Sequence, residues 1–147
     1  MINRAEEFCQ LRQDIELVYD NFARMNGLSY TALYTLNAIN SIEKCTQKKI
    51  CAQSFMPKQT INSVMKGLVD KGWVELITCK TDARERIACF TKKGKEEVLP
   101  LLTKIQEAET EAIAAFSEEE QLKLISMMRT YDEIYKQKML ARDEEEE

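Results

Sequence analysis

Apolar residues recur along this chain at two different spacings. In residues 5–25 they return every three or four positions, which predicts an amphipathic helix that ends at Asn26-Gly27. The same spacing predicts a second helix that begins at Ser29, a suitable N-cap, and a short third helix over residues 46–53. A fourth helix is predicted from Pro57 to about residue 71. The first half of the chain is therefore expected to be helical.

The spacing then changes to that of β-strands. Residues 73–79 and 87–91 are rich in β-branched and aromatic side chains, and residues 80–86 between them are polar and charged. This order predicts a β-hairpin with a charged tip.

Helical spacing returns in the last third of the chain. An apolar stripe over residues 101–116 predicts a long helix, and Pro100 predicts a kink or a delayed start. Ser117 with Glu120 forms a capping-box sequence, so a final helix should begin there. The acidic residues 143–147 are expected to be a disordered tail.

Composition limits the class of protein. The 147 residues fit one domain, the hydrophobic fraction of 44% is typical of a core-forming chain, and no apolar run is long enough to cross a bilayer. The charged N-terminus lacks the apolar stretch of a signal peptide, and the five cysteines are irregularly spaced, so we expect free thiols in the cytoplasm. The chain has no histidine and no phosphate-binding or nucleophile motif. We therefore expect that it is not an enzyme and that it has no cofactor and no metal site.

The net charge of −4 hides a segregation of charge. Residues 44–95 contain twelve Lys or Arg and four Asp or Glu, which leaves nine basic and 21 acidic residues in the rest of the chain. A basic middle between acidic arms is typical of a module that binds a polyanion, although a solvated charged surface would have the same composition.

The helix that begins near Pro57 suits the reading of DNA bases. Its pattern turns apolar residues inward and polar ones outward, and a short helix and a tight turn come before it, as in a helix-turn-helix. Amide and lysine side chains can bond base edges, and hydroxyls can bond phosphates. An ordinary solvent-facing helix surface is the alternative interpretation. The outward residues, which we predict to contact DNA, are Lys58, Gln59, Thr60, Asn62, Ser63 and Lys66.

The hairpin tip adds three cations, Lys80, Arg84 and Arg86, at the end of a short ribbon. Such a tip can place an arginine in the minor groove, where the negative potential is enhanced. Asp82 would be repelled by phosphates, so we expect it to cap the turn and to hold a nearby guanidinium. A charged hairpin without a partner remains the alternative.

These residues resemble the MarR family of winged helix-turn-helix transcription regulators. The resemblance rests on residues 50–74, on Asp82-Ala83-Arg84 in the wing, and on the exit at Phe90 to Gly94. It implies a homodimer whose two recognition helices read a palindromic operator, with Arg84 in the minor groove. It also implies that the recognition helix reads DNA through Lys58, Gln59, Thr60, Asn62 and Ser63.

The expected fold is mainly α with a small β-hairpin wing. We predict a single domain over 1–147, in which residues 29–95 form the winged helix-turn-helix DNA-binding lobe and residues 1–26 and 96–142 form dimerisation helices. The terminal helices carry more apolar seams than one winged helix needs, which favours burial in a second chain over wrapping of the same one.

The resemblance also suggests regulation. Relatives bind small aromatic or amphipathic molecules, and Tyr19, Phe22, Tyr30 and Tyr34 are the candidate lining of such a cleft, or plain core. Cys9 is the candidate redox residue, because some relatives sense oxidants near the first helix.

We therefore expect a sequence-specific regulator of transcription, a repressor that binds double-stranded DNA and is released by an effector. The alternatives are a winged-helix module that docks a protein and a thiol-based redox-sensing regulator.

Overall fold

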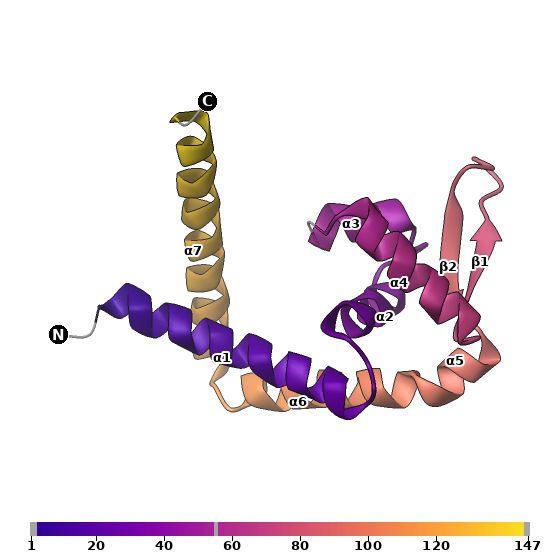
Figure 1. The fold of residues 1–147 in the computed structure, drawn as a ribbon. Helices are drawn as coiled ribbons and strands as arrows, with labels where there is room; N and C mark the ends of the chain where they lie inside the picture. The colour runs from indigo at the N-terminus through magenta and orange to yellow at the C-terminus, as the bar shows by residue number, and fades with distance from the viewer. Residues whose placement is uncertain (1–2, 55, 146–147) are drawn as a thin grey trace. The chain divides into compact units, whose positions relative to one another are not determined.

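The computed structural model describes residues 3–54 and 56–145, with side chains as far as residue 141. It has the expected class, a mainly helical chain with one two-stranded antiparallel hairpin (Figure 1). The elements are α1 (Arg4–Met25), α2 (Tyr30–Ser41), α3 (Gln47–Ser54), α4 (Lys58–Asp70), β1 (Val74–Thr78), β2 (Arg86–Phe90), α5 (Lys92–Glu97), α6 (Leu99–Ala114) and α7 (Glu118–Glu145). They fall into two compact units, Met1–Leu102 and Thr103–Glu147. None of the helices in the described part is long and apolar enough to cross a membrane.

Glycines end two of the helices in the first unit. Gly27 after α1 and Gly72 after α4 have φ of 70° and 76°, the left-handed conformation that glycine adopts at little cost. At both ends the two residues after the cap donate to the last turn, as in Leu28 N to Ala23 O (2.9 Å) and Trp73 N to Leu68 O (3.2 Å). These bonds fix where the chain leaves α1 and α4.

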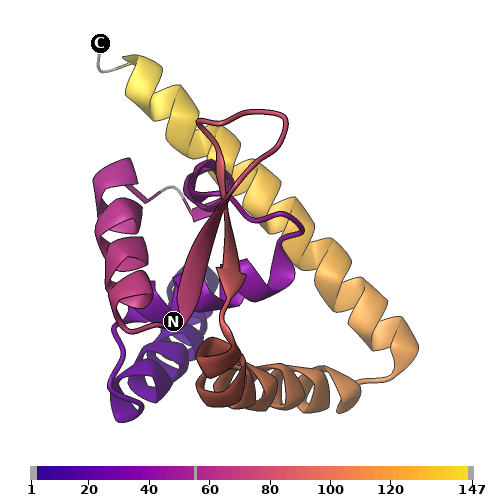
Figure 2. The ribbon, with the colours of Figure 1, turned by 90° about the vertical axis from the view of Figure 1, so that its right-hand side faces the viewer.

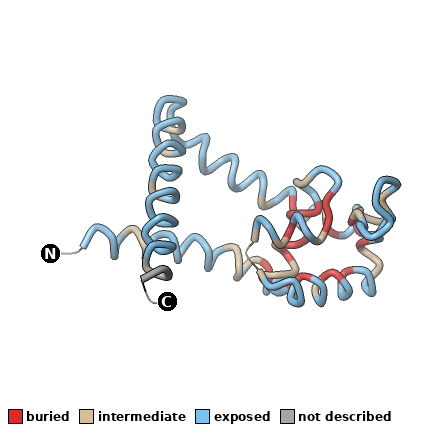
Figure 3. The backbone as a smooth tube through the Cα atoms, turned by 90° about the horizontal axis from the view of Figure 1, so that it is seen from above, coloured by how far each residue is buried: buried red, intermediate tan, exposed pale blue. Residues whose placement is uncertain are grey.

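The core of the first unit lies among α2, α3, α4 and the base of the hairpin (Figure 3). Its fully buried side chains include Leu33, Leu36, Ile50, Ile61 and Val74. On α4, Met65 and Leu68 are buried in this core, whereas Val69 is 37% exposed. Pro57 is the N-cap of α4, one residue before the helix, and not part of its first turn.

The hairpin pairs Val74 with Phe90 and Thr78 with Arg86, and Figure 2 shows its loop extending beyond the paired strands. An isolated bridge between Thr46 and Ile87 joins β2 to the start of α3. The register separates two cysteines of the hairpin. Cys79 lies at the loop end beside Glu85, whereas Cys89 is opposite Glu75 near the base.

The long helix predicted after the hairpin is broken into α5 and α6. Only Val98 separates α5 from α6, and α6 begins at Leu99, one residue before Pro100. The helix is therefore interrupted near Pro100, but its start is not delayed. Thr91 caps α5 by accepting from Gly94 N (3.0 Å). Gly94 packs against the chain after α4, where a Cβ atom would lie 2.0 Å from Trp73 O.

The second unit consists of the distal part of α6 and of α7. The predicted capping box is present, with Glu120 N donating to Ser117 Oγ (3.2 Å) and Ser117 N to Glu120 Oε2 (2.8 Å). Residues 103–141 include no buried side chain. The tail that we expected to be disordered over 143–147 is helical as far as Glu145, because α7 continues to that residue. Residues 146 and 147 lie outside the described part.

Candidate nucleic-acid interface

The polar face of α4 is fully accessible. The burial of Ile61, Met65 and Leu68 turns the opposite side of the helix to solvent. All of the residues predicted there are exposed, namely Lys58, Gln59, Thr60, Asn62, Ser63 and Lys66. The helix therefore presents amides, hydroxyls and lysines with no large apolar side chain among them.

The first turn of α4 faces a groove. The groove has a volume of about 640 Å³ and lies between the starts of α3 and α4 on one side and the wing on the other. Its lining consists of Thr46, Gln47, Lys48, Cys51, Lys58, Asn62, Leu76, Arg84, Glu85 and Arg86. The structure thus brings four of the predicted DNA contacts, Lys58, Asn62, Arg84 and Arg86, to one concave surface. Lys66 and Lys80 are exposed but do not line it.

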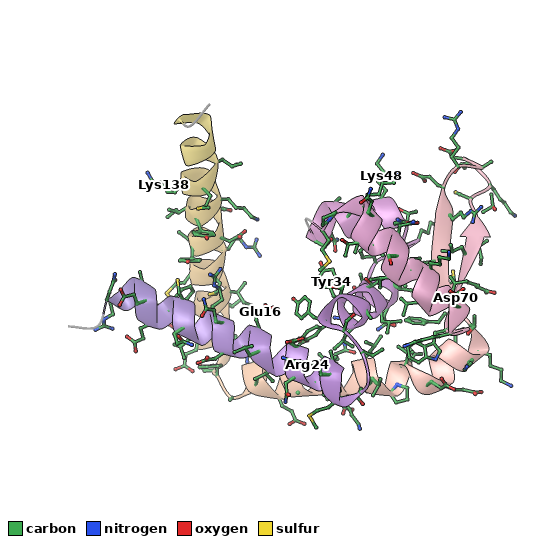
Figure 4. All side chains as sticks on the ribbon, in the orientation of Figure 1. Glu16, Arg24, Tyr34, Lys48, Asp70 and Lys138 are labelled. Carbon is green, nitrogen blue, oxygen red and sulfur yellow. The ribbon has the colours of Figure 1, made fainter. Side chains whose placement is uncertain are left out.

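The start of α3 is the part of this surface that sequence reasoning missed. Lys48 lies on the same side of the unit as the tip of the wing, opposite α5 (Figure 4). Gln47 reaches α4, where its Nε2 donates to Lys58 O (3.4 Å). The helix itself was predicted, but which of its side chains meet the wing depends on tertiary packing that the apolar pattern does not contain.

Asp82 organises the turn of the wing. Its Oδ1 accepts from the backbone N–H of Arg84 (2.9 Å), and its carbonyl accepts from Glu85 N (3.1 Å). The second role predicted for Asp82, holding a guanidinium, was wrong: within the described residues its carboxylate makes no ion pair. The carboxylate accepts a hydrogen bond from the backbone of Arg84 instead and does not hold its guanidinium.

Three of the four residues predicted to line an effector cleft form a chain of aromatic rings where α1 meets α2. Tyr19 and Tyr30 are edge to face, with centroids 5.3 Å apart, and Tyr30 stacks with Tyr34 at 6.4 Å. Phe22 is half-buried on α1. The labelled Glu16 and Tyr34 lie on α1 and α2 respectively in Figure 4.

An open pocket of about 650 Å³ adjoins this aromatic chain, but of the four predicted residues only Tyr30 lines it. The Tyr30 hydroxyl donates to Glu16 Oε2 (2.9 Å). Burial, followed by the bond to Glu16, raises the pKa of Tyr30 to about 12. Its phenol is thus neutral, and Glu16 and Asp20 place carboxylates on the same pocket.

All five cysteines are free thiols, as predicted. Cys9, the candidate redox residue, is half-buried on α1. Two others have shifted pKa values. Burial raises the pKa of Cys45 to about 11, whereas hydrogen bonds from the Thr81 hydroxyl and from the N–H groups of Thr81 and Asp82 lower the pKa of Cys79. Among the described residues, no group of three or more His, Cys, Asp or Glu could hold a metal ion.

Known proteins are similar to this chain in sequence and in fold. Residues 26–85 match the model of the MarR family. A MarR family regulator from Neisseria meningitidis superposes with a TM-score of 0.78 at 25% identity, over 94% of this chain and 97% of that one. Residues 26–85 are thus similar in sequence to the MarR family, and the chain as a whole resembles a MarR family regulator in fold.

Two further proteins are similar to the chain, one in sequence and one in fold. Over 78 residues the chain is 30% identical to the HTH-type transcriptional regulator SarZ of Staphylococcus epidermidis. This match covers 53% of either protein, so the chain spans about half the length of the curated relatives it matches. A MepR–DNA complex from S. aureus has the same fold, with a TM-score of 0.71 at 15% identity over 92% of this chain and 99% of MepR.

Proposed function

We propose that this protein is a MarR-family regulator of transcription that binds specific DNA sequences in the cytoplasm and acts as a repressor. The observation that carries the proposal is the meeting of the polar face of α4 with the basic wing on one groove. In this proposal α4 enters the major groove, where Gln59 and Asn62 bond adenine edges and Lys58 bonds guanine or phosphate. Arg84 at the wing tip enters the adjacent minor groove. The DNA bound by the similarly folded MepR supports this use of the fold.

The proposal includes a homodimer on a palindromic operator. The helices outside the winged helix-turn-helix expose apolar side chains that a monomer would leave in water, including Ile15 and Val18 on α1 and Leu122 and Leu140 on α7. None of the side chains described in α7, residues 118–141, is buried, and a helix of this kind gains stability mainly by packing against another element. A second copy would cover these faces and place two recognition helices about 34 Å apart, one turn of DNA.

Release by a small effector is the last part of the proposal. The aromatic chain of Tyr19, Tyr30 and Tyr34 beside an open pocket is suited to an aromatic or amphipathic molecule. A MarR of S. aureus with this fold, 17% identical at a TM-score of 0.70, is known in complex with salicylate and kanamycin.

Retention on random duplex DNA across a salt series, followed by selection of bound fragments from random sequence, tests the proposal. We expect affinity to fall steeply with salt and the selected sites to share a two-fold symmetric sequence. Arg84→Ala should weaken binding to all duplexes, whereas Gln59→Ala should mainly reduce discrimination, by about 1–3 kcal/mol at the base pair it reads. Absence of binding at low salt would contradict the proposal and favour a protein-docking module.

A further inference from the structure

Four cations line the groove between α3, α4 and the wing. Lys48, Lys58, Arg84 and Arg86 all line it, and within the described residues none of them is in an ion pair. Glu85 is the one carboxylate in the lining. Like charges gathered around a concavity repel one another, and this cost is relieved when an anion enters. The groove is therefore arranged for a negatively charged ligand.

The walls of the groove suit a single phosphate group. The hydrogen bond from Gln47 to Lys58 O ties the start of α3 to the start of α4, so these two walls are held together. No side chain caps α4, which leaves its first N–H groups available to an acceptor. The Thr46 hydroxyl and the Asn62 side-chain amide add uncharged donors to the lining. These donors and cations match phosphate oxygens in chemistry.

We propose that this groove holds one backbone phosphate of the bound DNA and that Lys48 is a further phosphate-binding residue. The inference rests on the proposed function. It adds the position of the DNA strand that passes between α4 and the wing. α4 reads the major groove on one side of this phosphate, and the wing reads the minor groove on the other. Lys48 contributes affinity and register but no sequence preference, because phosphates are the same at every base pair.

The test compares Lys48→Gln with Lys95→Gln. Lys95 is an equally exposed lysine on α5 and does not line the groove, so its substitution controls for the change in net charge. Lys48→Gln should weaken operator and random duplex by the same factor and should reduce the slope of log K against log salt by about 0.9 for each bound subunit. Lys95→Gln should leave the slope unchanged.

A modified duplex identifies the source of the phosphate. Neutral methylphosphonates are placed one at a time along each half-site. At one position the replacement should weaken binding of the wild-type protein while leaving binding of Lys48→Gln unaffected, since the charge pair is already lost. If no position behaves in this way, the groove does not hold a DNA phosphate.

Glu85→Gln provides a test that a damaged fold cannot imitate. Removal of the one carboxylate in the lining should tighten binding to both duplexes several-fold at low salt, because the carboxylate repels the phosphate. Unchanged affinity would place the phosphate elsewhere.

The outcomes separate this inference from the proposed function. If the wild-type protein binds no duplex, the function itself fails. If it binds with a steep salt dependence but Lys48→Gln behaves as Lys95→Gln does, only the phosphate site is overturned. A change in preferred sequence without a change in slope would make Lys48 a base contact and would also overturn it.

Discussion

The carboxylate of Asp82 accepts a 2.9 Å hydrogen bond from the backbone N–H of Arg84, two residues further along the wing turn. An aspartate beside DNA is unfavourable for charge reasons alone, so its presence needs a compensating role. The bond supplies one, because it fixes the backbone from which the Arg84 side chain extends. Geometry and charge at Asp82 thus have opposite effects on DNA binding, and substitution can separate them.

We expect Asp82→Ala to weaken binding to duplex DNA by about threefold to tenfold, the equivalent of one lost hydrogen bond. The ordered turn would become mobile, and binding would then have to order it. Asp82→Asn keeps the accepting oxygen and removes the charge, so it should bind at least as tightly as the wild type. Fluorescence anisotropy with a labelled duplex measures both. Tighter binding by Asp82→Ala would mean that repulsion outweighs the role of the turn.

Local rules located the helices and the hairpin from the sequence. Gly27, Ser29 and Ser117 act as predicted because capping depends on residues within one turn of the chain. The polar face of α4 followed from helical spacing, and the wing cations followed from the charged stretch between the two predicted strands. The groove was not predictable, since Lys48 reaches it only through the packing of α3 beside the wing. The absent ion pair of Asp82 is a similar case, because a backbone N–H competes for the carboxylate.

Two glycines should respond in opposite ways to the same substitution. A Cβ at Gly94 would lie 2.0 Å from Trp73 O, which cannot yield without moving the backbone, whereas nothing lies within 4 Å of a Cβ at Gly67 on α4. We expect Gly94→Ala to lower the free energy of unfolding by at least about 2 kcal/mol. Gly67→Ala should raise it by about 0.5–1 kcal/mol through better helix propensity. Urea denaturation measures both, and equal effects would show that the chain after α4 adapts easily.

Cys79 should be alkylated faster than Cys45 near neutral pH. The thiolate is the reactive form, and the hydrogen bonds that lower the pKa of Cys79 increase its thiolate fraction at a given pH. Cys45 is buried and its pKa is raised to about 11, so it should react only at strongly alkaline pH or after unfolding. Labelling with iodoacetamide, followed by peptide mass spectrometry across a pH series, gives both rates. Thr81→Val, which lacks the hydroxyl, should slow the labelling of Cys79 and leave Cys45 unchanged.

The exposed face of α1 has the spacing of a helix-packing seam. Leu11, Ile15, Val18 and Met25 repeat at intervals of three, four and seven residues, and all are more than half exposed in the single chain. Ala23 near the end of α1 and Leu28 just after it are buried in the core, whereas Leu11 and Ile15 in the first half of the helix are not. Such a seam predicts that the stable form of the protein contains a second α1-bearing chain.

Charges placed on this seam should therefore separate the subunits. Burial of an Ile or Val side chain contributes about 1.5–3 kcal/mol, so Ile15→Glu with Val18→Glu should weaken dimerisation by two orders of magnitude or more. Sedimentation equilibrium measures the change. Gln13→Glu, at an exposed polar position on the side of α1 away from the seam, controls for added charge and should remain as dimeric as the wild type. The double variant should also lose its preference for two-fold symmetric sites while it retains binding to random duplex, since each winged helix keeps its own cations. A wild-type protein that sediments as a monomer, or a double variant that remains dimeric, would contradict the role assigned to this face.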